Sequence, residues 1–115
     1  GEQIYLLPDQ APSLHGLKVL RAGLHLGQLS GKRFIPGHAL ALSLRPEQVI
    51  NYVNLDASDP LQLQTAICFL SGETFPYEGK NGWYLICIDG YSLGWGKLAG
   101  SIMKNHYPKG LRKYL

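Results

Sequence analysis

The chain has 115 residues, of which 45% are apolar and 17% are charged, and its formal net charge is +3. This length is enough for one domain with a hydrophobic core but not for two. The composition is that of a soluble globular protein, and no apolar run approaches the length of a membrane span. We therefore expect a soluble, monomeric, single-domain protein that has no part in a membrane.

The basic residues are concentrated in two segments that flank an acidic middle. Residues 10–46 and residues 97–115 each contain five bases and no acid. Residues 47–96 contain six acids and a single base, Lys80. If the fold brings the two basic segments together, they form one positive face of the kind that binds phosphate. The alternative is solvated charge scattered over the surface.

Short strands dominate the first third of the chain. A strand is expected over Gln3–Leu7, where Pro8 stops it, and two more over Leu17–Leu20 and Gly23–Leu29. A Ser30-Gly31 turn then leads to a short strand over Arg33–Ile35.

Helical patterns follow in the middle of the chain. The Ala- and Leu-rich segment His38–Leu44 is interpreted as helical, although its alternation also fits a strand. Pro46 suits a first helical turn, with Val49, Ile50 and Val53 at helical spacing, and residues 54–58 are a connection. The clearest helix runs over residues 60–71. Asp59 is its N-cap, an apolar stripe follows, and Gly72 ends it.

A buried hairpin organises the last third. Trp83–Ile88 is an unbroken apolar run, typical of a strand that is covered on both faces. Asp89-Gly90 provides the turn, and Tyr91–Leu98 is the returning strand. Residues 74–77 are expected to be extended, residues 101–106 are short and mixed, and residues 107–114 form an edge strand or an ordered tail. These elements predict an α+β fold, a small mixed β-barrel with one or two short helices.

Catalytic and metal-binding interpretations are weak. Cys87, Asp89 and His106 could form a nucleophilic set, but a thiol between Ile86 and Ile88 is expected to be buried and inert. Cys68 is expected to be buried as well, and two thiols in apolar runs are typical of a cytosolic protein. The four histidines lack the spacing of a zinc site, and no CxxC motif is present.

RNA binding is the interpretation that the charge pattern favours. Arg and Lys neutralise phosphates, and aromatic rings stack on unpaired bases. Core packing is preferred for Trp83, whereas Trp95 could lie in the core or on the surface, and Tyr107 could stack on a base or anchor the tail. Gly94 and Gly96 would let a phosphate backbone approach the hairpin. The candidate RNA-binding residues are Arg21, His25, Lys32, Arg33, Lys97, Lys104, Asn105, His106, Tyr107, Lys109 and Arg112.

Three ordered blocks carry a resemblance to a known family. They are LKVLRAGLHLGQLSGKRFIPGHALAL (residues 17–42), FLSGE (residues 69–73), and IDGYSLGWGK followed by KNHYPKGLR (residues 88–97 and 104–112). Together they resemble the C-terminal PUA-like RNA-binding domain of bacterial RsmF-type rRNA cytosine-C5 methyltransferases, members of the Sun/Nop family.

The resemblance implies a PUA-like mixed barrel over residues 1–115, either excised from a larger methyltransferase or accessory to one. It further implies a cytoplasmic protein whose partners are rRNA and a methyltransferase domain, in the same chain or in another.

The family's catalytic features are absent from this sequence. Its enzymes bind S-adenosylmethionine on a separate Rossmann-like domain and carry cysteines in Pro-Cys and Thr-Cys contexts. Here Cys68 and Cys87 each follow an isoleucine, and neither GLHLG nor GWG opens a helix in a βαβ unit. We therefore expect no catalysis and no cofactor in this chain, with S-adenosylmethionine bound by the parent catalytic domain.

Two alternatives belong to other functional classes. PUA-like barrels are similar to ASCH domains, some of which act on RNA or nucleosides. Such an enzyme would need Lys97, Lys104, Tyr107 and Asp89 to converge in a pocket, whereas a binding protein would carry them on a convex face. The second alternative is a module that docks on its own methyltransferase domain, which an exposed apolar patch would favour.

Overall fold

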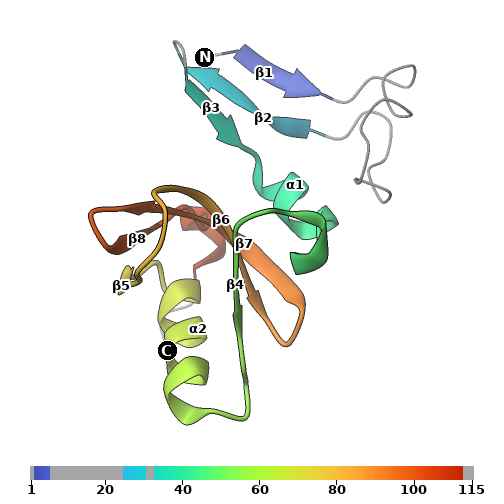
Figure 1. Ribbon diagram of the computed structural model, residues 1–115. Helices are drawn as coiled ribbons and strands as arrows, with labels where there is room; N and C mark the ends of the chain where they lie inside the picture. Colours follow the sequence, from blue (N-terminus) through green and yellow to red (C-terminus); the bar gives the residue numbers. More distant parts are fainter. Residues whose placement is uncertain (1, 6–24, 31–32, 113–115) are drawn as a thin grey trace.

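The computed structural model describes residues 2–5, 25–30 and 33–112 of the chain and contains two β-sheets and two α-helices (Figure 1). The smaller sheet is antiparallel, in the order β1-β2-β3. The larger sheet has the order β4-β6-β7-β8-β5, in which β4 and β6 are parallel and all other neighbours are antiparallel. The strands are β1 (Glu2–Tyr5), β2 (His25–Ser30), β3 (Arg33–Pro36), β4 (Tyr52–Leu55), β5 (Phe75–Pro76), β6 (Gly82–Ile88), β7 (Tyr91–Ala99) and β8 (Ile102–Asn105).

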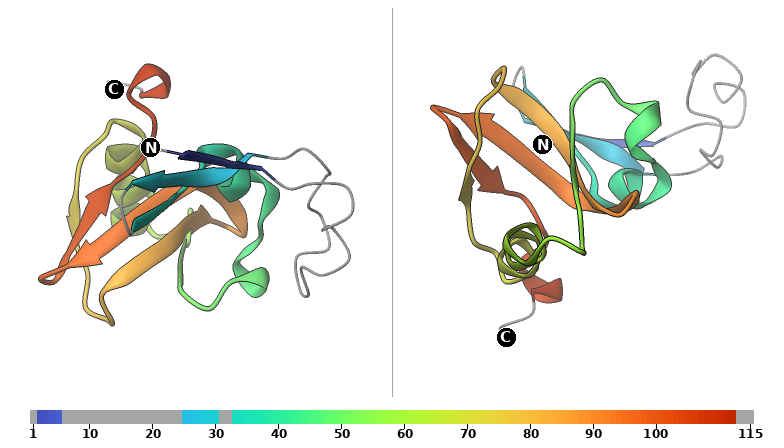
Figure 2. Two further views of the ribbon diagram at one scale, coloured as in Figure 1. Left: turned by 90° about the horizontal axis from the view of Figure 1, so that it is seen from above. Right: turned by 60° about the horizontal axis from the view of Figure 1, so that its bottom comes forward.

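The five-stranded sheet curls into a half-barrel, which agrees with the expected small α+β PUA-like fold. Helix α2 (Pro60–Leu70) lies on its inner side, and α1 (His38–Ser43) lies on the opposite side together with the three-stranded sheet (Figure 2). Two short 3₁₀ turns, η2 (Pro46–Gln48) and η3 (Lys109–Leu111), complete the described elements. None of the described helices is long and apolar enough to cross a membrane.

Strand alternation on the large sheet creates two separate core clusters. The inner face packs on α2, and the outer face packs on α1 and the segment after it. The inner cluster contains Val53, Leu55, Ala66, Phe69, Tyr84, Ile86, Leu98 and Met103. The outer cluster contains Ala41, Leu44, Leu85, Cys87 and Trp95. The expectation that β6 is covered on both faces is therefore confirmed.

The β6–β7 hairpin forms as its sequence predicts. Asp89 and Gly90 both have positive φ, 48° and 82°, as a type I′ turn requires. A bulge follows, because Ile86 pairs with Gly94 whereas Cys87 pairs with Ser92. The sheet places Trp95 on the outer face, where its indole Nε1–H donates a 2.9 Å hydrogen bond to the carbonyl of Gly37.

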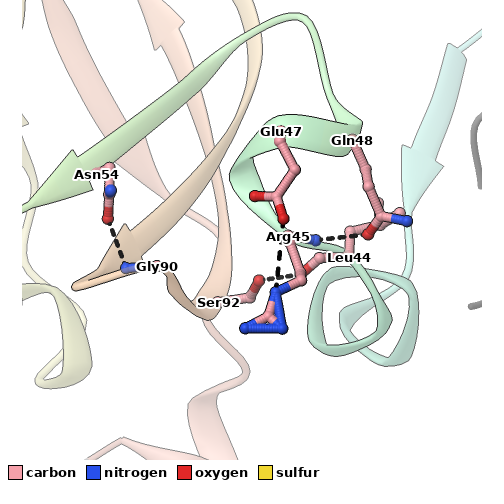
Figure 3. Close-up of polar contacts among 7 residues, drawn as sticks. All are labelled: Leu44, Arg45, Glu47, Gln48, Asn54, Gly90 and Ser92. Atoms are coloured by element: carbon pink, nitrogen blue, oxygen red, sulfur yellow. Dashed lines mark hydrogen bonds and ion pairs between the residues drawn. The ribbon is translucent and has the colours of Figure 1, made fainter.

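Helix α1 is joined to the large sheet at both of its ends. The bond from Trp95 to Gly37 holds its beginning, and the hydroxyl of Ser92 donates to the carbonyl of Leu44 at its end (Figure 3). Ala41 is completely buried between these two contacts. The helical interpretation of residues 38–44 is confirmed, because one face of this short segment is buried against β7.

The expected helix over residues 46–53 is wrong. Only Pro46–Gln48 is helical, as a single 3₁₀ turn, and Tyr52–Leu55 forms β4. In β4 the side chains alternate between exposed and buried, with Val53 and Leu55 in the inner cluster. The spacing of Val49, Ile50 and Val53 imitates a helix by chance, since Ile50 is 97% exposed.

Strand β4 is also tied to the hairpin turn. The Asn54 side-chain oxygen accepts a 2.8 Å hydrogen bond from the N–H of Gly90 (Figure 3). The Asp89 carboxylate accepts a 3.1 Å bond from the N–H of Ala57, and the Asp89 N–H donates to the carbonyl of Leu55 at 2.8 Å. These long-range bonds explain why the connection after β4 runs beside the turn.

The remaining expectations are mostly confirmed, with one correction in the tail. Helix α2 begins after Asp59, whose side chain accepts the N–H of Leu61 at 3.0 Å, and Gly72 follows it with a φ of 94°. The segment expected to be mixed, residues 101–106, instead contains β8, which Gly100 and Ser101 connect to β7 with positive φ angles. Of the two forms expected for residues 107–114, an edge strand or an ordered tail, no strand is found in the described part up to residue 112, where η3 lies. The strand expected over Leu17–Leu20 lies outside the described residues.

Leu44→Ala tests whether α1 is part of the main core. Leu44 is only 5% exposed, so truncation should destabilise the protein by about 2–5 kcal/mol. The urea unfolding curves measured by tryptophan fluorescence and by far-UV dichroism should shift together, because both clusters pack on β6 and β7 and should unfold as one unit. The control is Leu42→Ala, which changes an exposed side chain and should cost less than about 0.5 kcal/mol. Two separate transitions would contradict a shared core.

Candidate nucleic-acid interface

A row of three side chains crosses the outer face where α1 does not cover it. Trp83 of β6 pairs with Lys97 of β7, and Lys97 pairs with Lys104 of β8. Directly paired residues lie on the same face of a sheet, so the indole and both ammonium groups are neighbours. The row is exposed or half-buried along its length.

His106 joins this row from the end of β8. Its ring contacts that of Trp83 edge-on, with 4.5 Å between centroids and 67° between planes. Its backbone N–H donates to the carbonyl of Trp95 at 3.1 Å, which extends the β7–β8 pairing by one residue. Lys97 Nζ lies 5.2 Å from the centroid of the Trp83 ring, within range of a cation–π interaction. We call Trp83, Lys97, Lys104 and His106 the outer-face cluster.

No acid neutralises the outer-face cluster within the described part of the chain. The one salt bridge among the described residues lies outside the cluster. It joins Arg45 to Glu47 at 3.6 Å, and both side chains are largely exposed. Partial burial, and then the charges of Lys97 and Lys104, lower the pKa of His106 from its usual 6.5. His106 is therefore more often neutral at pH 7 than a free imidazole, and it presents an aromatic ring beside two positive charges.

Trp83 belongs to the outer-face cluster but was not among the RNA-binding candidates predicted from the sequence. It packs against the edge of the outer cluster but is only half-buried, so the core position expected for it is confirmed only in part. Trp95, which the sequence left open, is buried, with 7% of its surface exposed. The strand position relative to α1 decides between them: Trp95 lies under the helix, and Trp83 lies beyond it. Because α1 was itself ambiguous, the sequence held no clear signal for this difference.

Asn105 and Tyr107 lie on the opposite face from the outer-face cluster. The Asn105 amide nitrogen donates to the carbonyls of Phe69 and Glu73, at 2.7 and 3.0 Å, and its oxygen accepts the N–H of Tyr107 at 2.8 Å. The Tyr107 ring packs at 5.8 Å from Phe69 and edge-on at 5.3 Å from His38. These contacts give both residues a structural role in holding the tail against α2.

The last two candidates lie beyond the sheet. Lys109 is exposed on η3. Arg112 lies over Gly72, where an added Cβ would come within 2.6 Å of the Arg112 side chain. Its Nε is buried without a hydrogen-bond partner within the described ranges. Arg112 therefore packs at the C-terminal end of α2, away from the row on the outer face.

The predicted approach of a phosphate to Gly94 and Gly96 is wrong. Both glycines are buried, and side chains of the chain itself fill the space above them. A Cβ on Gly94 would lie 3.3 Å from Tyr107 and 3.4 Å from His38, and one on Gly96 would lie 2.7 Å from the sulfur of Met103. The glycines are needed for close packing inside the half-barrel rather than for ligand access.

The first basic segment is described only in part. His25 begins β2, opposite Tyr5, and Arg33 begins β3, opposite Ser30. Arg21 and Lys32 lie outside the described residues. The expected union of the two basic segments in one face therefore stays a prediction.

The arrangement required for an ASCH-type enzyme is not formed. Lys97 and Lys104 lie on the outer face, and Tyr107 packs against the inner cluster. Asp89 is at the hairpin turn, where its carboxylate is bonded to Ala57. Within the described ranges, no group of three His, Cys, Asp or Glu side chains is placed to hold a metal ion.

The two cysteines differ in their surroundings. Cys87 is completely buried in the outer cluster, and burial raises its thiol pKa to about 11. Cys68 is half-buried on α2, so the expectation of full burial is wrong for it. A hydrogen bond with Glu73 is the main cause that raises the pKa of Cys68. Neither thiol is placed to act as an activated nucleophile.

Comparison with protein families gives two matches in the order of the chain. The model of the RsmF rRNA methyltransferase first C-terminal domain matches residues 1–44. The model of the methyltransferase RsmF PUA domain matches residues 60–113. This chain belongs to the C-terminal, PUA-like region of the RsmF-type rRNA methyltransferases. Both matches are to accessory domains, and neither is to a catalytic domain.

The boundary between the two matched domains does not divide the hydrophobic core of this RsmF region. Ala41 and Leu44 belong to the first match, and they share the outer cluster with Leu85, Cys87 and Trp95 of the second. Helix α1 thus completes the core of the PUA domain. We propose that residues 38–112 fold as one unit.

Acidification should destabilise the fold through His106 and His38. Burial lowers the pKa of His38 from 6.5, and burial with the two lysines lowers that of His106. A histidine whose folded pKa lies below its unfolded value gives stability that is complete above pH 6.5 and is lost as the pH falls through the folded pKa. The melting temperature should therefore fall between pH 7.5 and pH 5, and His106→Gln should weaken that dependence. An unchanged pH profile in the variant would show that His106 is not coupled to folding.

Proposed function

We propose that this RsmF region binds rRNA through the outer-face cluster and so helps to position the RNA for the methyltransferase domain. The observation that carries the proposal is the row of Trp83, Lys97 and Lys104 on a solvent-facing part of the sheet. Two ammonium groups spaced along a row can contact successive phosphates, and the half-buried indole offers a surface for an unpaired base. The family matches support an RNA-related accessory role.

We further propose that the chemistry takes place on the rest of the parent protein, whose catalytic domain binds S-adenosylmethionine and transfers the methyl group to C5 of cytosine. This RsmF region takes no cofactor and acts as a monomer in the cytoplasm, and the methyltransferase domain lies in the same chain or in a partner. Lys109, Arg112, His25 and Arg33 extend the RNA contacts beyond the outer-face cluster.

Electrostatic and stacking contacts can be separated by salt titration. The probe is an rRNA hairpin with an unpaired loop, and its affinity is measured at several salt concentrations. Lys97→Ala with Lys104→Ala should weaken binding and reduce the log–log salt slope by about 1.5, because two phosphate contacts are lost. Trp83→Ala should weaken binding about tenfold or more and leave the slope unchanged, because stacking releases no counterions.

Two matched variants control for nonspecific effects. Lys80→Ala removes a lone base of the acidic middle, and Tyr91→Ala removes an aromatic ring that is 71% exposed at the hairpin turn. Both should bind like the wild type. If the double lysine variant keeps the wild-type affinity and slope, the outer-face cluster is not the RNA site.

A second candidate function is docking on the methyltransferase domain. A shallow hollow of about 170 Å³ lies between the end of α1 and the β6–β7 turn, with Leu42 and Tyr91 at its rim. These side chains are 57% and 71% exposed, and a partner protein seated on the hollow would bury them. In this case Leu42→Ser and Tyr91→Ser would weaken association with the catalytic domain and leave RNA binding intact.

A further inference from the structure

A groove of about 440 Å³ lies at the opening of the half-barrel, between its two edge strands. All four residues of β4 line one wall, β5 and Tyr77 line another, and two residues of α2 lie between them. The lining shares no residue with the outer-face cluster. The lining residues are Tyr52, Val53, Asn54, Leu55, Gln62, Thr65, Phe75, Pro76 and Tyr77.

The groove-facing edge of β4 offers backbone hydrogen-bonding groups. Leu85 N–H donates to Asn51 at 3.1 Å, and Asp89 N–H donates to Leu55 at 2.8 Å. In a parallel pair, alternate residues bond to the same neighbour, so Asn51, Val53 and Leu55 face β6. The N–H and C=O groups of Tyr52 and Asn54 therefore point away from β6, and no backbone partner for them is found in the described part of the chain.

The edge of β5 across the groove offers no backbone N–H for strand pairing. Tyr77 N–H donates to Ser101 at 3.0 Å, and Phe75 is paired with Met103, so both face β8. Pro76 lies between them, faces the groove, and has no N–H to donate. An extended segment that entered the groove would thus pair with β4 rather than with β5.

Side chains in the groove suit a polypeptide with alternating residues. Tyr52 is 45% exposed and Asn54 is exposed, whereas Val53 and Leu55 point into the inner cluster. The Asn54 oxygen is used by Gly90, which leaves its amide N–H groups for a ligand. An added strand would therefore meet the exposed residues Tyr52 and Asn54 of β4 rather than the buried side chains of Val53 and Leu55.

Acidic residues come shortly before or after each element that lines the groove, and we call them its acidic border, although none of them is itself a lining residue. Asp56 directly follows β4, Asp59 directly precedes α2, and Glu73 and Glu78 flank β5 on either side. The one base of this acidic middle segment is Lys80. This charge repels the phosphates of RNA and attracts a positively charged segment.

We propose that β4 binds an extended, basic polypeptide segment of a partner protein by strand addition in this groove. The added strand would pair with the outward backbone groups of Tyr52 and Asn54, and its Lys or Arg side chains would meet the acidic border. The free edge of a strand that is otherwise part of a stable sheet is a natural template for such pairing. This function is independent of RNA binding on the outer face.

The first test uses two extended peptides of about eight residues, acetylated KVKVTVKV and its acetylated acidic analogue EVEVTVEV. Amide spectra of the ¹⁵N-labelled chain are recorded during each titration. The basic peptide should shift the amide resonances of Tyr52 and Asn54 saturably and slow the hydrogen exchange of both. The acidic peptide should not. Equal binding of both peptides, or of neither, would overturn the proposal.

The second test removes one backbone donor. Tyr52→Pro deletes an N–H that faces the groove, which an edge position tolerates, and should weaken the basic peptide about tenfold. Tyr52→Val keeps that N–H and should lose less. If Tyr52→Pro does not fold, a peptide N-methylated on every second residue answers the same question with the wild-type chain. Methylation of one alternate set of peptide nitrogens should abolish binding, because those N–H groups face β4. If the two peptides, each methylated on one of the alternate sets, both still bind, strand pairing is overturned.

An oligouridine titration distinguishes the other ligand class. Saturable shifts at Tyr52 and Asn54 with oligouridine, and none with the basic peptide, would assign the groove to RNA instead and overturn the proposal. Shifts confined to the outer-face cluster would support the separation of the two sites.

Discussion

The hydrogen bond from the Trp95 indole to the carbonyl of Gly37 fixes the relation between α1 and the half-barrel. With it, Ala41 and Leu44 are buried on Leu85 and Cys87, and the outer face of the sheet is divided in two. The part beneath α1 is core. The part beyond α1 keeps the outer-face cluster accessible, so the same packing that stabilises the domain also defines its proposed binding surface.

The two buried glycines of β7 position that surface from the other side of the sheet. Gly94 gives room to Tyr107 and His38, and Gly96 gives room to Met103. Tyr107 then anchors the tail, while the alternation of β8 turns the preceding residue, His106, outward onto Trp83. Residues with structural roles and residues of the proposed binding surface therefore alternate along this segment, so a short basic tail contributes to both the core and the surface.

Strong local signals made much of this fold predictable. The Asp-Gly turn, the capped helix after Asp59 and the apolar run of β6 each depend on neighbouring residues, and each was found. Strand β4 was not predicted, because its four residues are extended through pairing with a parallel strand about thirty residues away. The local hydrophobic pattern carries no information about such pairing. The exposure of Trp83 could not be predicted for the same reason, since it depends on where α1 ends above the sheet.

Tryptophan fluorescence offers the most direct measurement of the central claim, because the two indoles lie on opposite sides of the proposed boundary. Trp83 is half-buried in the outer-face cluster, and Trp95 is buried beneath α1. A short oligouridine should quench the emission of the wild type by stacking on Trp83. In Trp83→Phe the remaining indole should not respond. Quenching that persists in Trp83→Phe, or that is absent in the wild type under conditions where RNA binds, would contradict the account.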